Sequence, residues 1–232
     1  MSVCLGSAKV CMLRVARLDD TGYSATVVNG VATGVSGATA GAVSSAIVRL
    51  QSTAEYDSGM EYIQKNGCGD ICLSLRDNDK LKRMSLQLEL CTRDLELIEI
   101  MTGATLYTVT GAGGIAGLAR RGVGVADAKP CSVELWTRAI DSTGASQATT
   151  QKWWRWVYPR CNFTLGDTTL EAGIATVQLK GYADPNPFWG NGPWNDWPAT
   201  AFPDPTSPEH FVIDTVGPPA ATCGYTTVPT AS

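Results

Sequence analysis

Hydrophobic and polar residues alternate along much of this 232-residue chain, most clearly between residues 71 and 90. Ile71, Leu73 and Leu75 alternate with polar or small residues, and the same period of two returns over residues 84–90. A period of two is typical of strands that bury one face. Because the polar residues 77–80 separate the two runs, the sequence predicts a β-hairpin with its leucines facing a core.

The period of the pattern changes after residue 91. Thr92 can cap a helix through its hydroxyl, and an apolar stripe at helical spacing follows through Leu95, Ile98 and Met101. Gly103 can supply the left-handed residue that ends a helix. The sequence therefore predicts one short helix over about residues 92–102. This helix is expected to flank the sheet, because two or three turns need packing partners to be stable.

Further apolar or alternating runs predict more strands, at residues 12–18, 46–53, 104–110, 132–140, 153–158 and 173–181. Pro159 is expected to put the aromatic run before it at a sheet edge or a strand end, since proline lacks the N–H that a sheet uses. Three segments predict long loops: the small-residue segment 29–46, the polar segment 54–70 and the glycine-rich segment 111–126. The chain is thus expected to be mainly β.

The character of the sequence changes at residue 185. Ten of the twelve prolines lie in residues 185–232, so regular structure is not expected to run far there. Large aromatic side chains, which are costly to leave in water, are also concentrated there: Phe188, Trp189, Trp194, Trp197, Phe202 and Phe211. We therefore expect one β-domain, residues 1–184, followed by an extended arm, residues 185–232, that docks on its own body or on a neighbouring subunit.

Composition narrows the possible function classes. The chain is 44% hydrophobic and 17% charged, as in globular proteins. Its net charge of −4 comes from the acidic arm, while residues 1–184 are balanced, so the basic surface of a nucleic-acid-binding domain is not expected. The sequence shows no apolar run long enough to cross a bilayer and no recognisable signal segment, which predicts a cytosolic origin without a membrane anchor.

No pattern of reactive side chains predicts catalysis or metal binding. The eight cysteines are spread along the chain, Cys68 and Cys72 are the only close pair, and His210 is the only histidine. Zinc sites usually show two close pairs of ligands, so we expect reduced structural cysteines. The glycine-rich residues 111–114 lack the Lys-Ser/Thr of a phosphate-binding loop, and no nucleophile motif is present. The sequence predicts no enzyme, no metal and no cofactor.

Five motifs follow one another at residues 12–19, 53–67, 71–75, 86–103 and 177–188. In their order along the chain they resemble the major tail tube proteins of long, non-contractile-tailed bacteriophages, particularly those of actinobacterial hosts. Each motif is short, and the order of all five carries the resemblance. It covers about residues 12–198.

The resemblance implies an antiparallel β-sandwich or barrel with one flanking helix. It also implies hexameric rings that stack helically into the tail tube of the virion, assembled in the cytoplasm of the host bacterium. Such a tube houses the tape-measure protein, conducts double-stranded genomic DNA into the host, and meets the tail terminator and distal tail proteins. Open sheet edges, long loops and an aromatic arm suit this kind of self-assembly.

Two groups of residues are candidates for roles in such a tube. DNA must slide through the lumen, so acidic residues on inner strands are expected to line it, and Glu89 and Glu134 are the candidates. The alternative is that both are ordinary solvent-side residues in local ion pairs. The candidate anchors between subunits are Trp189, Trp194, Trp197 and Phe202 in the arm, and Tyr56 and Tyr62 in segment 54–70.

Two other function classes stay open at this point. One is a different ring-forming virion protein, such as a tail terminator, a distal tail protein or a capsid decoration protein. The other is a β-sandwich carbohydrate-binding module, in which tryptophans such as Trp153, Trp154 and Trp156 would stack on sugar rings. The alternative interpretation is that these tryptophans pack in cores and interfaces, where tryptophan is common.

Overall fold

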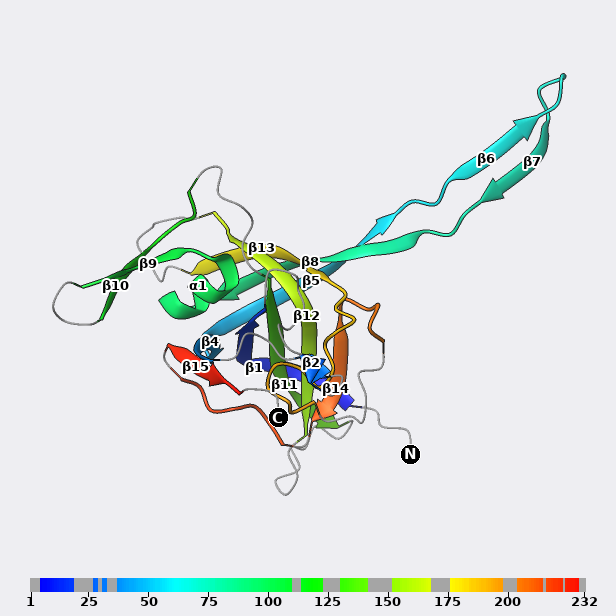
Figure 1. Ribbon diagram of the computed structural model, residues 1–232. Coiled ribbons are helices and arrows are strands. Elements are labelled where there is room, and N and C mark those ends of the chain that lie inside the picture. The colour runs from blue at the N-terminus through cyan, green and yellow to red at the C-terminus, as the bar shows by residue number, and fades with distance from the viewer. Residues whose placement is uncertain are drawn as a thin grey trace.

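The computed structural model describes residues 5–18, 27–28, 31–32, 37–109, 114–122, 130–141, 152–167, 176–197, 204–214, 216–222 and 224–229. This part of the chain is mainly β, with antiparallel pairing and one short helix, α1 (Leu95–Thr102) (Figure 1). The strands are β1 (Leu5–Arg17), β2 (Val27–Val28), β3 (Val31–Ala32), β4 (Gly37–Ser44), β5 (Ile47–Asp57), β6 (Glu61–Lys65), β7 (Ile71–Arg76), β8 (Lys80–Leu90), β9 (Thr105–Thr108), β10 (Ile115–Ala119), β11 (Cys131–Asp141), β12 (Trp153–Leu165), β13 (Val177–Asp184), β14 (His210–Asp214) and β15 (Tyr225–Val228).

The main sheet has nine strands within the described part, in the order β15-β4-β1-β11-β12-β13-β8-β5, with β14 added beside β12. The long strand β12 connects its two halves. Its first part pairs with β11 and β14, and its second part, Arg160 to Leu165, pairs with β13. Residues of both halves share one core, including Leu13 of β1, Val133 of β11 and Leu88 of β8. The fold is therefore sandwich-like, with β12 common to both halves.

Pro159 lies inside β12, so the prediction that it ends a strand or marks an edge is wrong. On one side of β12, the ladder with β14 stops at Val157 and the ladder with β13 begins at Arg160. On the other side, the register shifts between Val133 and Cys131 of β11. Proline therefore occupies a gap in both ladders, where its missing N–H leaves no pairing group unsatisfied.

The predicted leucine face of residues 84–90 is confirmed. Met84, Leu86, Leu88 and Leu90 are all buried, while the residues between them face outward. The predicted helix is also confirmed, although it starts at Leu95.

Asp94, not Thr92, caps α1, and its carboxylate accepts the backbone N–H of Leu97 at 3.1 Å. Gly103 ends the helix in the left-handed region, with φ 63°, as predicted. The buried stripe of the helix faces the shared core through Leu97, Ile98 and Met101.

The predicted pairing of residues 71–76 is wrong. Strand β7 pairs with β6, and β8 pairs with β5 and β13. Ile71, Leu73 and Leu75 are 60%, 57% and 57% exposed, so they do not face the core of their own chain. Alternation along one strand shows that its two faces differ, but it does not show what covers the apolar face.

The three predicted loops also contain strands. Segment 29–46 holds β4, which lies inside the main sheet between β15 and β1. Its small residues are required there, because a Cβ on Gly41 would lie 2.6 Å from the ring of Trp194. Segment 111–126 holds β10, which pairs with β9 to form a separate hairpin. Segment 54–70 holds the end of β5 and all of β6.

The described parts of residues 185–232 pack on the body of their own chain. Strands β14 and β15 join the main sheet, beside β12 and β4 respectively. The hydroxyl of Tyr158 donates to the carboxylate of Glu209 at 2.6 Å, which fixes the segment before β14. The arm thus forms more regular structure than its prolines suggest, because sheet edges of the body supply the pairing partners.

Candidate functional site

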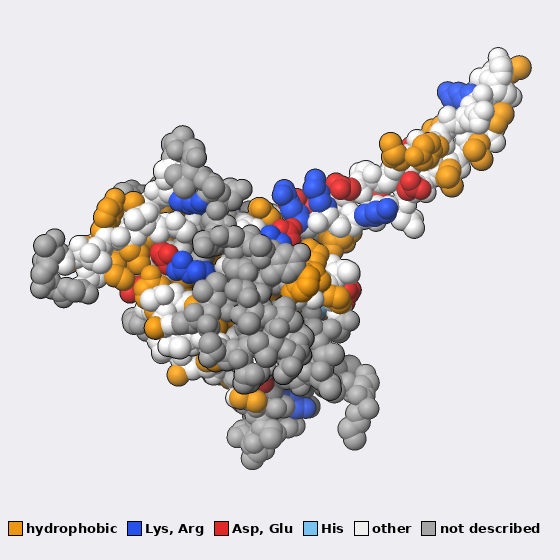
Figure 2. Space-filling view, in the orientation of Figure 1, with side chains coloured by type: hydrophobic (Ala, Val, Ile, Leu, Met, Phe, Trp, Pro, Cys, Tyr) orange, Lys and Arg blue, Asp and Glu red, His pale blue; other side chains and the backbone are white. Residues whose placement is uncertain are grey.

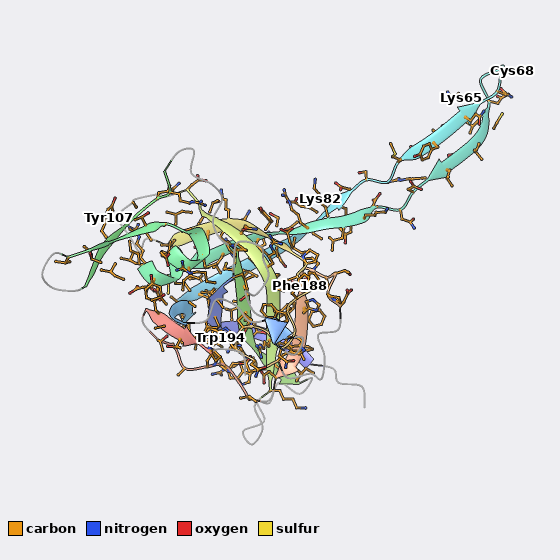
Figure 3. All side chains as sticks on the ribbon, viewed as in Figure 1. Lys65, Cys68, Lys82, Tyr107, Phe188 and Trp194 are labelled. Atoms are coloured by element: carbon orange, nitrogen blue, oxygen red, sulfur yellow. The ribbon has the colours of Figure 1, made fainter. Side chains whose placement is uncertain are left out.

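A two-stranded projection extends far from the body (Figure 1). Strands β5 and β8 run past the main sheet and stay paired as far as Tyr56–Leu81 and Asp57–Lys80, and β6 and β7 continue to the tip. We call residues 56–81 the ribbon. Cys68 lies at its outer end (Figure 3).

The ribbon carries most of the exposed large hydrophobic side chains in the described part of the chain. They are between 44% and 67% exposed. They are Tyr56, Met60, Tyr62, Ile63, Ile71, Leu73, Leu75 and Leu81. Hydrophobic side chains gather along the ribbon in Figure 2. Monomeric proteins rarely expose such a continuous row, so it indicates an interaction surface.

The strand register places five of these side chains on one face. Tyr62 is paired with Leu75, and Gln64 with Leu73, so these residues share a face, together with Ile71 two positions before Leu73. Met60 is on the same side, since the Tyr62 hydroxyl contacts its sulfur at 3.2 Å. We call Met60, Tyr62, Ile71, Leu73 and Leu75 the apolar face of the ribbon. The opposite face pairs Glu61 with Arg76 and Ile63 with Ser74, and it is mostly polar.

Hydrogen bonds fix both ends of the outer ribbon. At its base, the N–H of Gly59 donates to the Asp79 carboxylate at 2.9 Å, and the N–H of Asp77 donates to the carbonyl of Met60 at 3.0 Å. The Gly59 hydrogen bond holds the pKa of Asp79 below its ordinary value. At the tip, the Asn66 side-chain oxygen accepts the N–H groups of Cys68 and Asp70, at 3.0 and 2.8 Å. The ribbon is therefore a shaped element with specified turns.

A pair of strands with both outer edges unpaired is marginal in water by itself. An ordered ribbon that exposes its apolar face to water is unfavourable unless a partner covers that face. Tyr56 and Tyr62, two of the predicted anchors, lie here and are 61% and 51% exposed. Their side chains are accessible to another molecule, and the contact itself stays a prediction.

Sequence reasoning missed the apolar face. It assigned the leucines of β7 to the core and residues 54–70 to a loop. The signal that was present is a pair of short alternating runs, residues 61–65 and 71–76, separated by the turn-forming Asn66, Gly67 and Gly69. That spacing is typical of a hairpin.

Glu134 cannot line a channel, so this prediction is wrong. Its side chain is 1% exposed and ion-paired with Arg14 and with Arg155, the latter at 3.1 Å. Asp196 of the arm completes the cluster, at 2.8 Å from Arg14 and 2.7 Å from Arg155. Glu134 was predicted to face solvent because it alternates with apolar neighbours, but the arm covers that face of β11.

The side chains of this cluster stay ionised because each is paired with an opposite charge. Burial opposes ionisation of Asp196, but the hydrogen bond and charge of Arg14, helped by Arg155, outweigh it and hold the pKa of Asp196 below its ordinary value. Burial likewise opposes the charge of Arg155, yet the carboxylates of Glu134 and Asp196 raise its pKa above the ordinary value. The members of the cluster therefore stay charged, and their ion pairs hold the arm on the body.

Tryptophan rings enclose the two arginines. The Arg14 guanidinium lies 5.0 Å from the ring centre of Trp136 and 4.7 Å from that of Trp194. Arg155 lies 5.2 Å from Trp136 and 5.6 Å from Trp197. The arm is thus held on β1, β11 and β12 by stacking as well as by charge.

The predicted anchors of the arm are largely used within their own chain. Trp189 is 1% exposed, Trp197 is 8% exposed, and Trp194 is half-buried against Arg14 and Ala16. As anchors between subunits, Trp189 and Trp197 are therefore wrong in this structure, because the body of the same chain covers them. Phe202 lies outside the described residues.

Glu89 lies on the outward face of β8 and is partly exposed. It is ion-paired with Arg49 of β5 at 3.3 Å, as the interpretation of a local ion pair expects. The neighbouring pairs on this face are Arg83–Glu55 at 2.6 Å and Lys180–Asp167 at 3.0 Å. A role for Glu89 at a lumen stays a prediction.

The histidine and the cysteines of the described residues differ in burial. No cluster of three or more His, Cys, Asp or Glu side chains could hold a metal there. His210 is buried with its Nε2 3.2 Å from the Ser207 carbonyl, and burial lowers its pKa. Burial also raises the thiol pKa of Cys131, to about 12, and of Cys161. Cys68, Cys72 and Cys91 are exposed free thiols.

Within the described residues, α1 is the one helix, and its 8 residues are far too few to span a bilayer. Comparison of the chain with protein-family models and with curated proteins finds no match in either case.

Proposed function

We propose that this protein is the structural subunit of a bacteriophage tail tube, in which hexameric rings stack helically. The apolar face of the ribbon is the observation that carries this proposal. The ribbon projects beyond the body and presents hydrophobic side chains where its own chain has nothing to cover them within the described residues. A second copy is a natural partner, because a subunit that both projects and receives contacts can extend an assembly indefinitely. The motif order described above supports the tube class.

The outward face of β5, β8 and β13 suits a channel that DNA passes through. Its cations Arg49, Arg83 and Lys180 are each paired with a carboxylate. A cation that is already paired with a carboxylate binds DNA phosphate weakly. Contact with DNA would therefore release few counterions, and the affinity for DNA would be low. Under this proposal Glu89, and not Glu134, is the candidate lumen residue.

The remaining partners and the location belong to the same proposal. A tube of this class encloses the tape-measure protein, conducts double-stranded DNA, and ends at the tail terminator and distal tail proteins. It is assembled in the host cytoplasm and works in the virion. The support is the resemblance of the motifs, together with an antiparallel sandwich-like fold that has open edges at β5 and β15.

Negative-stain electron microscopy of the purified protein across a concentration series tests the proposal. Hollow tubes or stacked rings are expected. Single rings that never stack would favour a tail terminator, distal tail or decoration protein. A monomer at every concentration, also after addition of preformed tail tips as initiators, would contradict the proposal.

A second candidate function has one observation in its favour. Phe211 is 60% exposed, and its ring centre lies 5.9 Å from Trp154 and 5.2 Å from Trp156. Exposed aromatic rings can stack on sugars, so a carbohydrate-binding module is the alternative. The edge-on and tilted geometry provides less flat surface than stacking requires. Binding of cell-wall glycans that is lost in Phe211→Ala would favour it.

A further inference from the structure

Three asparagines of the chain are each followed by a glycine, at positions 29, 66 and 191. Because glycine has no side chain, its backbone nitrogen can approach the preceding asparagine side chain closely and attack the amide carbon. The product is a five-membered cyclic imide, which water opens to aspartate or isoaspartate. Asn29 lies outside the described residues, whereas Asn66 and Asn191 are described and differ in their surroundings.

Asn66 lies at the outer end of the ribbon, between Lys65 and Cys68 in the chain (Figure 3). Asn66 and Gly67 are both exposed, so water reaches the amide group. The N–H of Gly69 donates to the carbonyl of Asn66 at 3.0 Å and closes a turn, in which Gly67 is the second residue. The N–H of Gly67 makes no hydrogen bond to any described residue, so its nitrogen is available for attack.

Hydrogen bonds at the tip also polarise the amide that would be attacked. The side-chain oxygen of Asn66 accepts the N–H groups of Cys68, at 3.0 Å, and of Asp70, at 2.8 Å. Negative charge develops on this oxygen when a nitrogen adds to the amide carbon, and two N–H donors at such distances stabilise it, as in an oxyanion hole. The Asp70 carboxylate accepts from the Asn66 Nδ2 at 3.3 Å and orients the amide.

The Asn-Gly pair at position 191 is protected in the folded chain. The N–H of Gly192 donates to the carbonyl of Trp189 at 2.8 Å, so attack on the Asn191 side chain must first break this hydrogen bond. Gly192 is also buried, and a Cβ there would lie 2.9 Å from the Trp189 ring. This close packing opposes the rotation of the peptide that attack requires.

We propose that Asn66 is a self-modification site, at which the Gly67 nitrogen closes a cyclic imide on the Asn66 side chain. A bond forms between the Gly67 nitrogen and the Asn66 Cγ, and the bond between Cγ and Nδ2 breaks. The proton of the Gly67 nitrogen ends on Nδ2, which leaves as ammonia. One water molecule then opens the imide. Opening at the side-chain carbonyl yields aspartate, and opening at the main-chain carbonyl yields isoaspartate, whose main chain runs through Cγ.

The modification changes the end of the ribbon in two ways. A carboxylate at position 66 replaces the amide donor that now lies 3.3 Å from the Asp70 carboxylate, so attraction becomes repulsion between like charges. Isoaspartate also adds one carbon to the main chain and so disrupts the turn that Gly69 closes. The tip of an aged chain should therefore open, whether or not copies of the chain assemble.

Incubation of the full chain at mildly alkaline pH, followed by peptide mass spectrometry, measures both asparagines in one sample. In the folded protein, Asn66 should convert about tenfold faster than Asn191 or more, because only the Gly192 nitrogen is hydrogen-bonded. In urea, where both segments are unfolded, the two rates should be similar. Equal rates in the folded protein would overturn the inference, and so would faster conversion of Asn66 in urea than in the folded protein.

Hydroxylamine identifies the cyclic imide, because it cleaves the chain at an imide. Cleavage between Asn66 and Gly67 is expected in incubated protein, and conversion of Asn66 without such cleavage would contradict attack by the Gly67 nitrogen.

Variants locate the attacking group. Gly67→Ala should slow the conversion of Asn66 about tenfold, since a Cβ hinders the approach of the nitrogen. Its fold should be retained, because a Cβ there meets no atom within 4 Å, and Gly114→Ala in the other hairpin is the matched control for the same reason. Circular dichroism checks the fold of both variants. Equal conversion of Asn66 in the two variants would overturn the proposed chemistry.

Discussion

Gly59 shows how one residue determines where the ribbon leaves the body. A Cβ at this position would lie 1.8 Å from the carbonyl oxygen of Asp77, a distance that no packing tolerates. Gly59→Ala should therefore break the hydrogen bonds at the ribbon base and leave the core intact. Amide hydrogen exchange should become faster in residues 60–76 and stay unchanged in β11 and β12.

Gly67→Ala is the matched control for this prediction. It lies in the same ribbon, and a Cβ there meets no atom within 4 Å. Equal exchange in the two variants would contradict the role of close backbone approach at Gly59.

His210 predicts the pH dependence of stability near neutrality. Burial lowers its pKa, although Asp204 and Glu209 nearby favour the charged form. The unfolded chain then binds more protons than the folded chain below the ordinary histidine pKa of about 6.5, so stability should fall as pH drops from 7.5 to 5.5. Urea unfolding measures this slope. Because the chain has one histidine, His210→Gln should flatten it, and an unchanged slope would contradict the assignment.

At the scale of elements, the arm is fixed by a small number of charged contacts. Asp196→Asn leaves Arg14 and Arg155 with one fewer carboxylate in a largely buried cluster. Removing a partner from a fully buried pair costs about 3–5 kcal/mol, and solvent at the half-exposed Asp196 reduces the expected loss to about 1–2 kcal/mol. Urea unfolding at pH 7 measures it. Asp167→Asn is the control, since its exposed pair with Lys180 should contribute little.

The sequence predicts well those elements that are determined by residues close together in the chain. Helix α1 ends at Gly103 because glycine adopts the left-handed conformation, and β8 buries its leucines because they alternate. The ribbon was not predicted because its apolar side chains have no cover in their own chain. Glu134 was misplaced because its partner Arg14 lies 120 residues earlier in the chain, and no local pattern encodes that contact.

At the scale of the whole molecule, sheet order was also beyond local prediction. Strand β12 pairs with β11 before Pro159 and with β13 after it, which depends on contacts between distant segments. The mainly β class was predictable, because alternating runs and turn residues fill the chain. Pairing partners were not, because several strands have equivalent patterns.

Under the proposed tube function, the outward face of β5, β8 and β13 leads to a prediction about DNA passage. Glu89→Lys removes the partner of Arg49 and leaves two free cations on the outward face of β8 and β5. Tubes should still form, but genome release should slow, more strongly at low salt, because free cations bind phosphate. Ejection of DNA from phages carrying the variant measures this. Asp204→Lys in the arm is the control, and equal kinetics in all three phages would contradict a lumen role for Glu89.

The position of β14 and β15 in the chain affects when the protein can fold. Both strands follow residue 209, yet they pair with β12 and β4 in the middle of the main sheet and at its edge. The nascent chain therefore cannot complete this sheet until residues 210–228 have been synthesised. A chain that ends before residue 210 should leave sheet edges and aromatic residues of β12 uncovered, and such exposed surfaces bind chaperones.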